Sequence, residues 1–123
     1  MTETNIELVR RGYQAALRGD FDTIRELLAP DVKWHGGEPS DPAACHNRQE
    51  ALEVMRNAPS RRGVGELVDV VGAGDKVVVI MRPRSQDGGP VATVANLTTI
   101  REGKVVEMVH YPDPAAALAA AGV

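Results

Sequence analysis

With 123 residues, 43% of them hydrophobic and 25% charged, the chain has the length and composition of one soluble globular domain, residues 1–123, that can bury a core. A formal net charge of −3 gives no reason to expect a nucleic-acid partner, and no apolar run approaches the roughly 18 residues of a membrane span. A polar, acidic N-terminus unlike a signal peptide, together with the single cysteine Cys45, predicts a cytoplasmic protein.

The first half of the chain has helical periodicity. Three helices are expected, each after a residue whose side chain can cap it: Thr4, Asp20 and Asn47. The first cap is followed three residues later by Glu7, which makes a capping box, and Gly19 ends that helix. Pro30 is expected to end the second helix, and a short strand at 32–35 follows it. The third helix is expected to stop at residues 58–60.

From residue 64 the pattern becomes typical of strands. Four strands are predicted, at residues 64–71, 76–82, 91–101 and 104–111. Their connections are short enough for an antiparallel meander, and Glu102-Gly103 supplies the last turn. A short alanine-rich helix over 115–121 follows, with Gly122 behind it. Helices segregated from an antiparallel sheet predict the α+β class.

Three polar side chains stand in otherwise apolar stretches. Asn96 and His110 interrupt the last two strands, and a buried asparagine must be satisfied by some partner. His110 shares a strand face with Met108, and histidine is the side chain best suited to exchange protons near neutral pH, so His110 is a candidate base, with a structural histidine as the alternative. Tyr13 lies in the apolar stripe of the first helix, as a hydrogen-bond donor or simply as a core tyrosine.

Three motifs, in this order, resemble the nuclear-transport-factor-2-like superfamily, in its SnoaL-like and ketosteroid-isomerase-like branch. They are Tyr13-x-Ala-Ala-Leu-x-Gly-Asp20, Leu28-Ala-Pro-Asp-Val-x-Trp-His35 and Gly103-Lys-Val-Val-x-Met-x-x-Tyr-x-Asp-Pro114. The resemblance implies a cone-shaped, curved antiparallel sheet wrapped around the N-terminal helices, a cystatin-like roll with an apolar pocket. It also implies a homodimer that pairs through the outer face of the sheet.

The resemblance to ketosteroid isomerases further implies roles for individual residues. The two oxyanion donors of that mechanism fall on Tyr13 and Asn96. The base falls near Gly36, which cannot accept a proton, so His110 is the substitute base. His35 is beside the base position, although strand alternation would turn it away from the side of Trp34.

The predicted ligand is a small apolar organic molecule with a carbonyl group. The residues expected to contact it are Trp34, His35, Met55, Met81 and Met108. Proton transfer, as in an isomerase, cyclase or dehydratase, is the predicted chemistry, and a non-catalytic ligand-binding or dimerisation module is the alternative. No cofactor or metal is expected, because the three histidines are scattered and the glycines form no phosphate loop.

Overall fold

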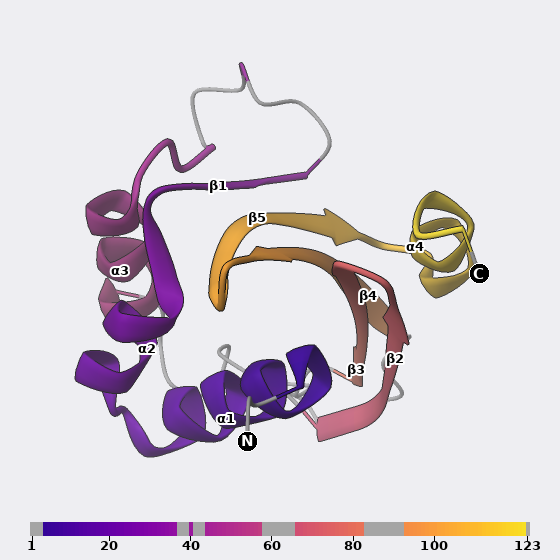
Figure 1. The fold of residues 1–123 in the computed structure, drawn as a ribbon, viewed down its shortest axis with the longest axis horizontal. Helices are drawn as coiled ribbons and strands as arrows, with labels where there is room; N and C mark the ends of the chain where they lie inside the picture. The colour runs from indigo at the N-terminus through magenta and orange to yellow at the C-terminus, as the bar shows by residue number, and fades with distance from the viewer. Residues whose placement is uncertain (1–3, 37–39, 41–43, 58–65, 83–92, 123) are drawn as a thin grey trace, which may run out of the picture.

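The computed structural model describes residues 4–36, 40, 44–57, 66–82 and 93–122. Its elements are α1 (Asn5–Arg18), α2 (Phe21–Leu27), β1 (Leu28–His35), α3 (Arg48–Asn57), β2 (Glu66–Ala73), β3 (Lys76–Arg82), β4 (Val94–Arg101), β5 (Lys104–Tyr111) and α4 (Pro114–Ala120). The strands form one sheet in the order β1-β5-β4-β3-β2. Figure 1 shows this sheet curving around α1, with α2 and α3 beside β1 and α4 against the outer face. The predicted α+β class and the curved sheet are confirmed.

Local capping explains where the first two helices begin and end. The Thr4 hydroxyl oxygen accepts a hydrogen bond from the Glu7 backbone N–H at 3.1 Å, which confirms the N-terminal cap of α1. Gly19 ends α1 with φ 71°, a left-handed conformation that glycine adopts without strain. The Asp20 carboxylate then accepts from the Thr23 backbone N–H at 3.3 Å and begins α2. Hydrogen bonds from the Thr23 hydroxyl and N–H lower the pKa of Asp20.

The predicted end of the second helix at Pro30 is wrong. Helix α2 ends at Leu27, and Leu28 is already extended and begins β1. Pro30 lies within β1, between the pairs Leu28↔Val105 and Lys33↔Glu107, where the register with β5 shifts. A proline is tolerated there because β1 is an edge strand and the ladder is irregular, so the missing N–H leaves no central hydrogen bond unmade.

The meander forms as predicted, with β2, β3, β4 and β5 pairing antiparallel in sequence. At the last turn both Glu102 and Gly103 have positive φ, of 53° and 76°, as a two-residue turn matched to strand twist requires. Strand β1 adds to the meander in parallel with β5, which the sequence pattern did not predict. The predicted starts of two strands at 64 and 91, and the stop at 58–60, lie outside the described residues.

Apolar side chains are buried on both faces of the sheet. Val77 and Val79 belong to a cluster on the concave face with residues of α1, α2 and α3. Val78, between them, belongs to a second cluster on the outer face with Ala117 of α4. Helix α1 lies so close to β2 that a Cβ on Gly72 would be 2.9 Å from Ile6 Cδ1. Among the described helices, none is long and apolar enough to cross a membrane.

Candidate ligand site on the concave face

The centre of the concave face carries a polar pair between residues 83 positions apart. Asn96 Nδ2 donates a hydrogen bond to Tyr13 Oη at 2.9 Å. The strand register places Asn96 opposite Val79, a fully buried member of the concave cluster, so Asn96 points towards α1. Helix α1 carries Tyr13 on the stripe that packs against this cluster. The structure therefore brings together the two residues expected to hold a ligand oxygen, Tyr13 and Asn96.

One polar atom of this pair has no partner. Asn96 is only 9% exposed, and its Oδ1 makes no hydrogen bond within the part of the chain that the structure describes. Buried polar groups in native proteins are nearly always paired, and an unpaired one costs about 1–3 kcal/mol. If the amide oxygen and nitrogen of Asn96 were exchanged, an NH₂ donor would occupy this position, and it would also have no partner. The site therefore has an unmet hydrogen bond beside the Tyr13 hydroxyl.

Burial raises the pKa of Tyr13 above its ordinary value, and the hydrogen bond from Asn96 opposes this shift in part. The phenol consequently stays neutral at physiological pH and keeps its proton. Because its oxygen already accepts from Asn96, that proton is available to donate to another group. Tyr13 is thus suited to hold a carbonyl or enolate oxygen and unsuited to act as a base.

His110 is the direct cross-strand partner of Asn96, so both side chains leave the sheet on the concave face. The histidine is exposed, whereas the asparagine is buried. The role of His110 as a base stays a prediction. Gly36, at the expected base position, follows the end of β1, and a Cβ added there would meet no heavy atom within 4 Å. The space at this position could hold a side chain, but glycine has none.

Three of the expected contact residues lie in one cluster on the concave face. Met81 and Met108 are buried there, and Trp34, the parallel partner of Met108, packs against the same cluster. Met55 is in α3, and its side chain lies outside the described part of the chain. An enclosed apolar pocket lined by these residues stays a prediction.

His35 does not lie with the other expected contact residues. It is the parallel partner of Val109, which belongs to the cluster on the outer face. There its Nε2 lies 3.0 Å from Glu107 Oε2, and its side chain is 7% exposed. Strand alternation persists to the end of β1, so no loop irregularity turns the ring back towards Trp34.

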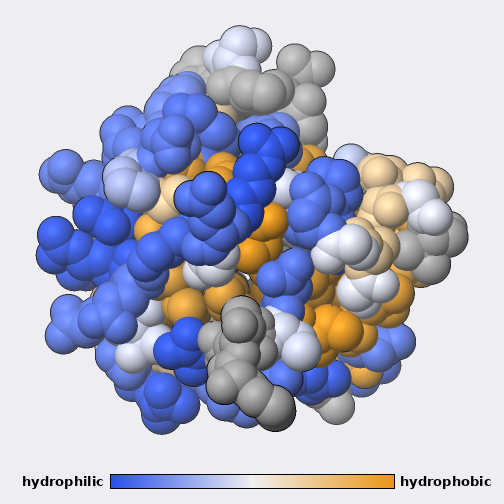
Figure 2. Space-filling model, viewed as in Figure 1, coloured by the Kyte–Doolittle hydropathy of each residue, from blue (hydrophilic) through white to orange (hydrophobic). Residues whose placement is uncertain are grey.

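A groove that the sequence did not predict lies on the helical side of the molecule. It measures about 420 Å³ and is lined by Arg25, Pro30, Asn47, Arg48, Gln49, Leu52, Glu53 and Arg56. Figure 2 shows hydrophilic residues over α2 and α3, with hydrophobic residues between these helices and the sheet. The available signal was the four-residue spacing of Arg48, Leu52 and Arg56 on one side of α3. Within the described ranges, no group of three His, Cys, Asp or Glu side chains could hold a metal ion.

Comparison with protein families gives one match, to the SnoaL-like domain, over residues 9–108. This range begins inside α1 and ends inside β5, so it contains both members of the Tyr13–Asn96 pair. No curated protein sequence matches the chain.

Several solved structures share the fold. An NTF2-like protein of unknown function from Cytophaga hutchinsonii superposes with a TM-score of 0.72 at 14% identity, covering 94% of this chain and 96% of its own. Bal32a, from a soil-derived mobile gene cassette, has a TM-score of 0.70 at 22% identity, with 85% and 86% covered. A candidate polyketide cyclase from Sinorhizobium meliloti has a TM-score of 0.69 at 20% identity, with 84% and 92% covered. At these identities the likeness establishes the fold alone.

Proposed function

We propose a ligand-binding function from the premise that this chain belongs to the SnoaL-like domain family. The proposed ligand is a small, largely apolar organic molecule with a carbonyl group, bound on the concave face of the sheet. The observation that carries the proposal is the buried Asn96 amide, whose Oδ1 has no partner while its Nδ2 is bonded to Tyr13. A ligand that pairs with this atom relieves a cost of about 1–3 kcal/mol.

The polar atoms define which ligand groups fit. Tyr13 offers an O–H proton to a carbonyl oxygen, and Asn96 Oδ1 accepts a hydrogen bond from a neighbouring hydroxyl or enol. The buried sulfur side chains of Met81 and Met108, on the same face, favour an apolar and polarisable ligand body. A hydroxy ketone or an enolisable diketone on an aromatic frame combines these features.

Matched hydroxyl deletions test this proposal. A thermal-shift screen with aromatic hydroxy ketones and their deoxy analogues is expected to give shifts only for compounds that carry the oxygens. Tyr13→Phe should remove most of the shift, by lowering ligand affinity about tenfold. Tyr111→Phe deletes the hydroxyl of the other tyrosine, which packs on the outer face, and should behave as the wild type. Equal shifts in the two variants would contradict the proposal.

Proton transfer on the bound carbonyl compound is the second candidate function, favoured by the position of His110 directly across from Asn96. The imidazole would remove a proton from the carbon next to the carbonyl, and Tyr13 would stabilise the enolate oxygen. The non-catalytic alternative requires binding at the same place without this exchange.

Hydrogen–deuterium exchange separates these two functions without knowledge of the product. In D₂O, NMR would follow exchange of the α-protons of the best-binding ketone. Catalysed exchange should be lost in His110→Gln and kept in His46→Gln, which alters an exposed histidine before α3. Gly36→Asp adds a carboxylate where there is open space and should increase the exchange rate. Binding without any exchange above buffer would assign the non-catalytic function.

A further inference from the structure

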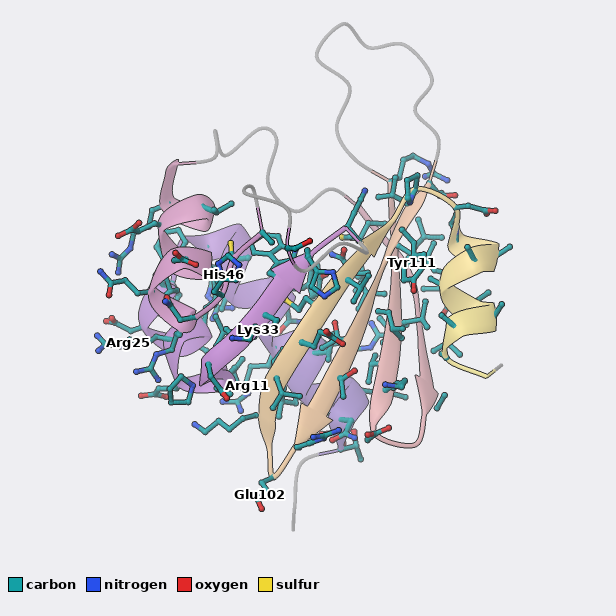
Figure 3. The ribbon with its side chains drawn as sticks, turned by 90° about the horizontal axis from the view of Figure 1, so that it is seen from above. Arg11, Arg25, Lys33, His46, Glu102 and Tyr111 are labelled. Atoms are coloured by element: carbon teal, nitrogen blue, oxygen red, sulfur yellow. The ribbon has the colours of Figure 1, made fainter. Side chains whose placement is uncertain are left out.

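We propose that the groove between α2, α3 and the start of β1 binds a small dianion, a phosphate ester or a dicarboxylate, through three arginines. Arg25 lines the groove from α2, and Arg48 and Arg56 line it from α3. Figure 3 shows Arg25 at the edge of the molecule next to α3. None of the residues of the concave pair lines this groove, so the proposal stands apart from the function proposed above.

The dimensions of the groove suit a small molecule. Its volume of about 420 Å³ falls within the range of about 300–1,000 Å³ that is usual for ligand sites. Leu52, which is 6% exposed, marks where the groove meets the core. Arg48 and Arg56 are four residues before and after it on α3, so they follow the same side of the helix about 12 Å apart along its axis. Arg25 supplies a third cation from the neighbouring helix.

The charge of the groove is opposite to that of the whole chain. Three guanidinium groups line it against one carboxylate, Glu53, although the chain has a net charge of −3. Over the residues that the structure describes, none of the three guanidiniums forms an ion pair. Neighbouring cations repel one another, and a bound anion would offset this repulsion.

One of the three cations is already held in position. The Arg56 guanidinium lies 5.7 Å from the centroid of the Phe21 ring, a cation–π contact from α3 to α2. A guanidinium fixed in this way presents a planar pair of N–H donors, which matches the paired oxygens of a carboxylate or phosphate. Less side-chain entropy is then lost when the anion binds.

The arrangement favours a small anion over a nucleic acid. The three arginines line one groove instead of forming the extended basic stripe that follows a phosphate backbone. The net negative charge of the chain would also repel a polyanion. A molecule with two negative charges matches the excess of two cations over the single Glu53 carboxylate in the lining.

Titration with two probes tests the site. Glycerol phosphate and glutarate would be titrated separately into ¹⁵N-labelled protein at constant ionic strength, with sodium chloride as the reference, while the arginine Nε–H signals are followed by NMR. We expect saturable shifts for at least one probe, and the stronger probe assigns the phosphate or the carboxylate class. Linear shifts no larger than those with sodium chloride, for both probes, would overturn the proposal.

Charge-removing variants locate the binding. Arg25→Gln and Arg48→Gln should each weaken the affinity for the stronger probe about tenfold. Arg101→Gln, which changes an exposed arginine at the end of β4, should leave the affinity unchanged. Thermal unfolding of each variant would establish that it is folded. Equal affinities in Arg48→Gln and Arg101→Gln would overturn the proposal.

Discussion

Two polar pairs sit on opposite faces of the same sheet, and they differ in what they leave unpaired. On the concave face, Asn96 donates to Tyr13 at 2.9 Å and keeps a buried oxygen with no partner. On the outer face, His35 lies 3.0 Å from Glu107, whose side chain is 41% exposed. The Glu107 carboxylate is open to bulk solvent, whereas the Asn96 oxygen is buried away from it. The outer pair can complete its hydrogen bonds with solvent, whereas the concave pair keeps one buried atom unpaired among the described residues.

The largest effect is expected from Asn96→Leu. The leucine removes the unpaired amide together with its bond to Tyr13, so we expect affinity for the best-binding ketone to fall at least tenfold. Stability should change by no more than about 1 kcal/mol, because the amide is only half satisfied in the free protein. Calorimetric titration and chemical denaturation measure the two quantities. A variant that does not fold would show that Asn96 serves the core and not a ligand.

The second-largest effect is expected at alkaline pH, on the free energy of unfolding. Burial raises the pKa of folded Tyr13, so the unfolded chain loses this proton first as the pH rises. The contribution to stability is therefore complete below about pH 10 and is lost as the pH climbs from there through the folded pKa, by up to about 1.4 kcal/mol per pH unit. Denaturation curves from pH 8 to pH 12 would record this loss. In Tyr13→Phe the slope should be reduced by this amount, and an unchanged slope would show that Tyr13 is not its source.

The outer pair should affect stability but not binding. A double-mutant cycle with His35→Ala, Glu107→Ala and the combined variant should give a coupling free energy of up to about 1 kcal/mol. Ligand affinity should be the same in all four proteins, because both side chains lie on the face opposite Asn96. A loss of affinity in Glu107→Ala would mean that the two faces are coupled.

The smallest effect is expected at the rim of the sheet. Lys104, at the start of β5, donates a hydrogen bond from its ammonium group to the backbone carbonyl of Glu26 in the last turn of α2. The contact is exposed, so Lys104→Met should lower the free energy of unfolding by about 0.5 kcal/mol. Ligand affinity should not change. A loss above about 2 kcal/mol would show that this contact, and not the packing of apolar side chains, holds the hairpin to the helices.

Features that depend on neighbouring residues could be predicted from the sequence. The cap at Thr4, the left-handed Gly19 and the Glu102-Gly103 turn all follow from short-range hydrogen bonding and backbone preference. The prediction that Pro30 ends a helix is wrong because the effect of a proline depends on whether a neighbouring strand needs the N–H that proline lacks. That neighbour is β5, far along the chain.

The candidate sites show the same limit. Asn96 could be singled out because an amide in an apolar strand needs a partner, and the resemblance supplied Tyr13 as a second donor. The unpaired state of one amide atom depends on how α1 packs across the concave face and places Tyr13 beside Asn96, and no local sequence pattern contains this information. The arginine groove was missed because each arginine, taken alone, looks like part of a solvated helix face. Only the fold brings α2 and α3 together around it.

The parallel pairing of β1 with β5 has a consequence for folding during translation. The His35–Glu107 contact joins residues 72 positions apart, and among the strands that the structure describes β1 pairs only with β5. The nascent chain must therefore carry β1 without its strand partner until residues 104–111 have emerged, with only α2 and α3 among the described helices to cover its apolar side chains. We expect chaperones to engage this segment during translation, and chains truncated before residue 104 to aggregate.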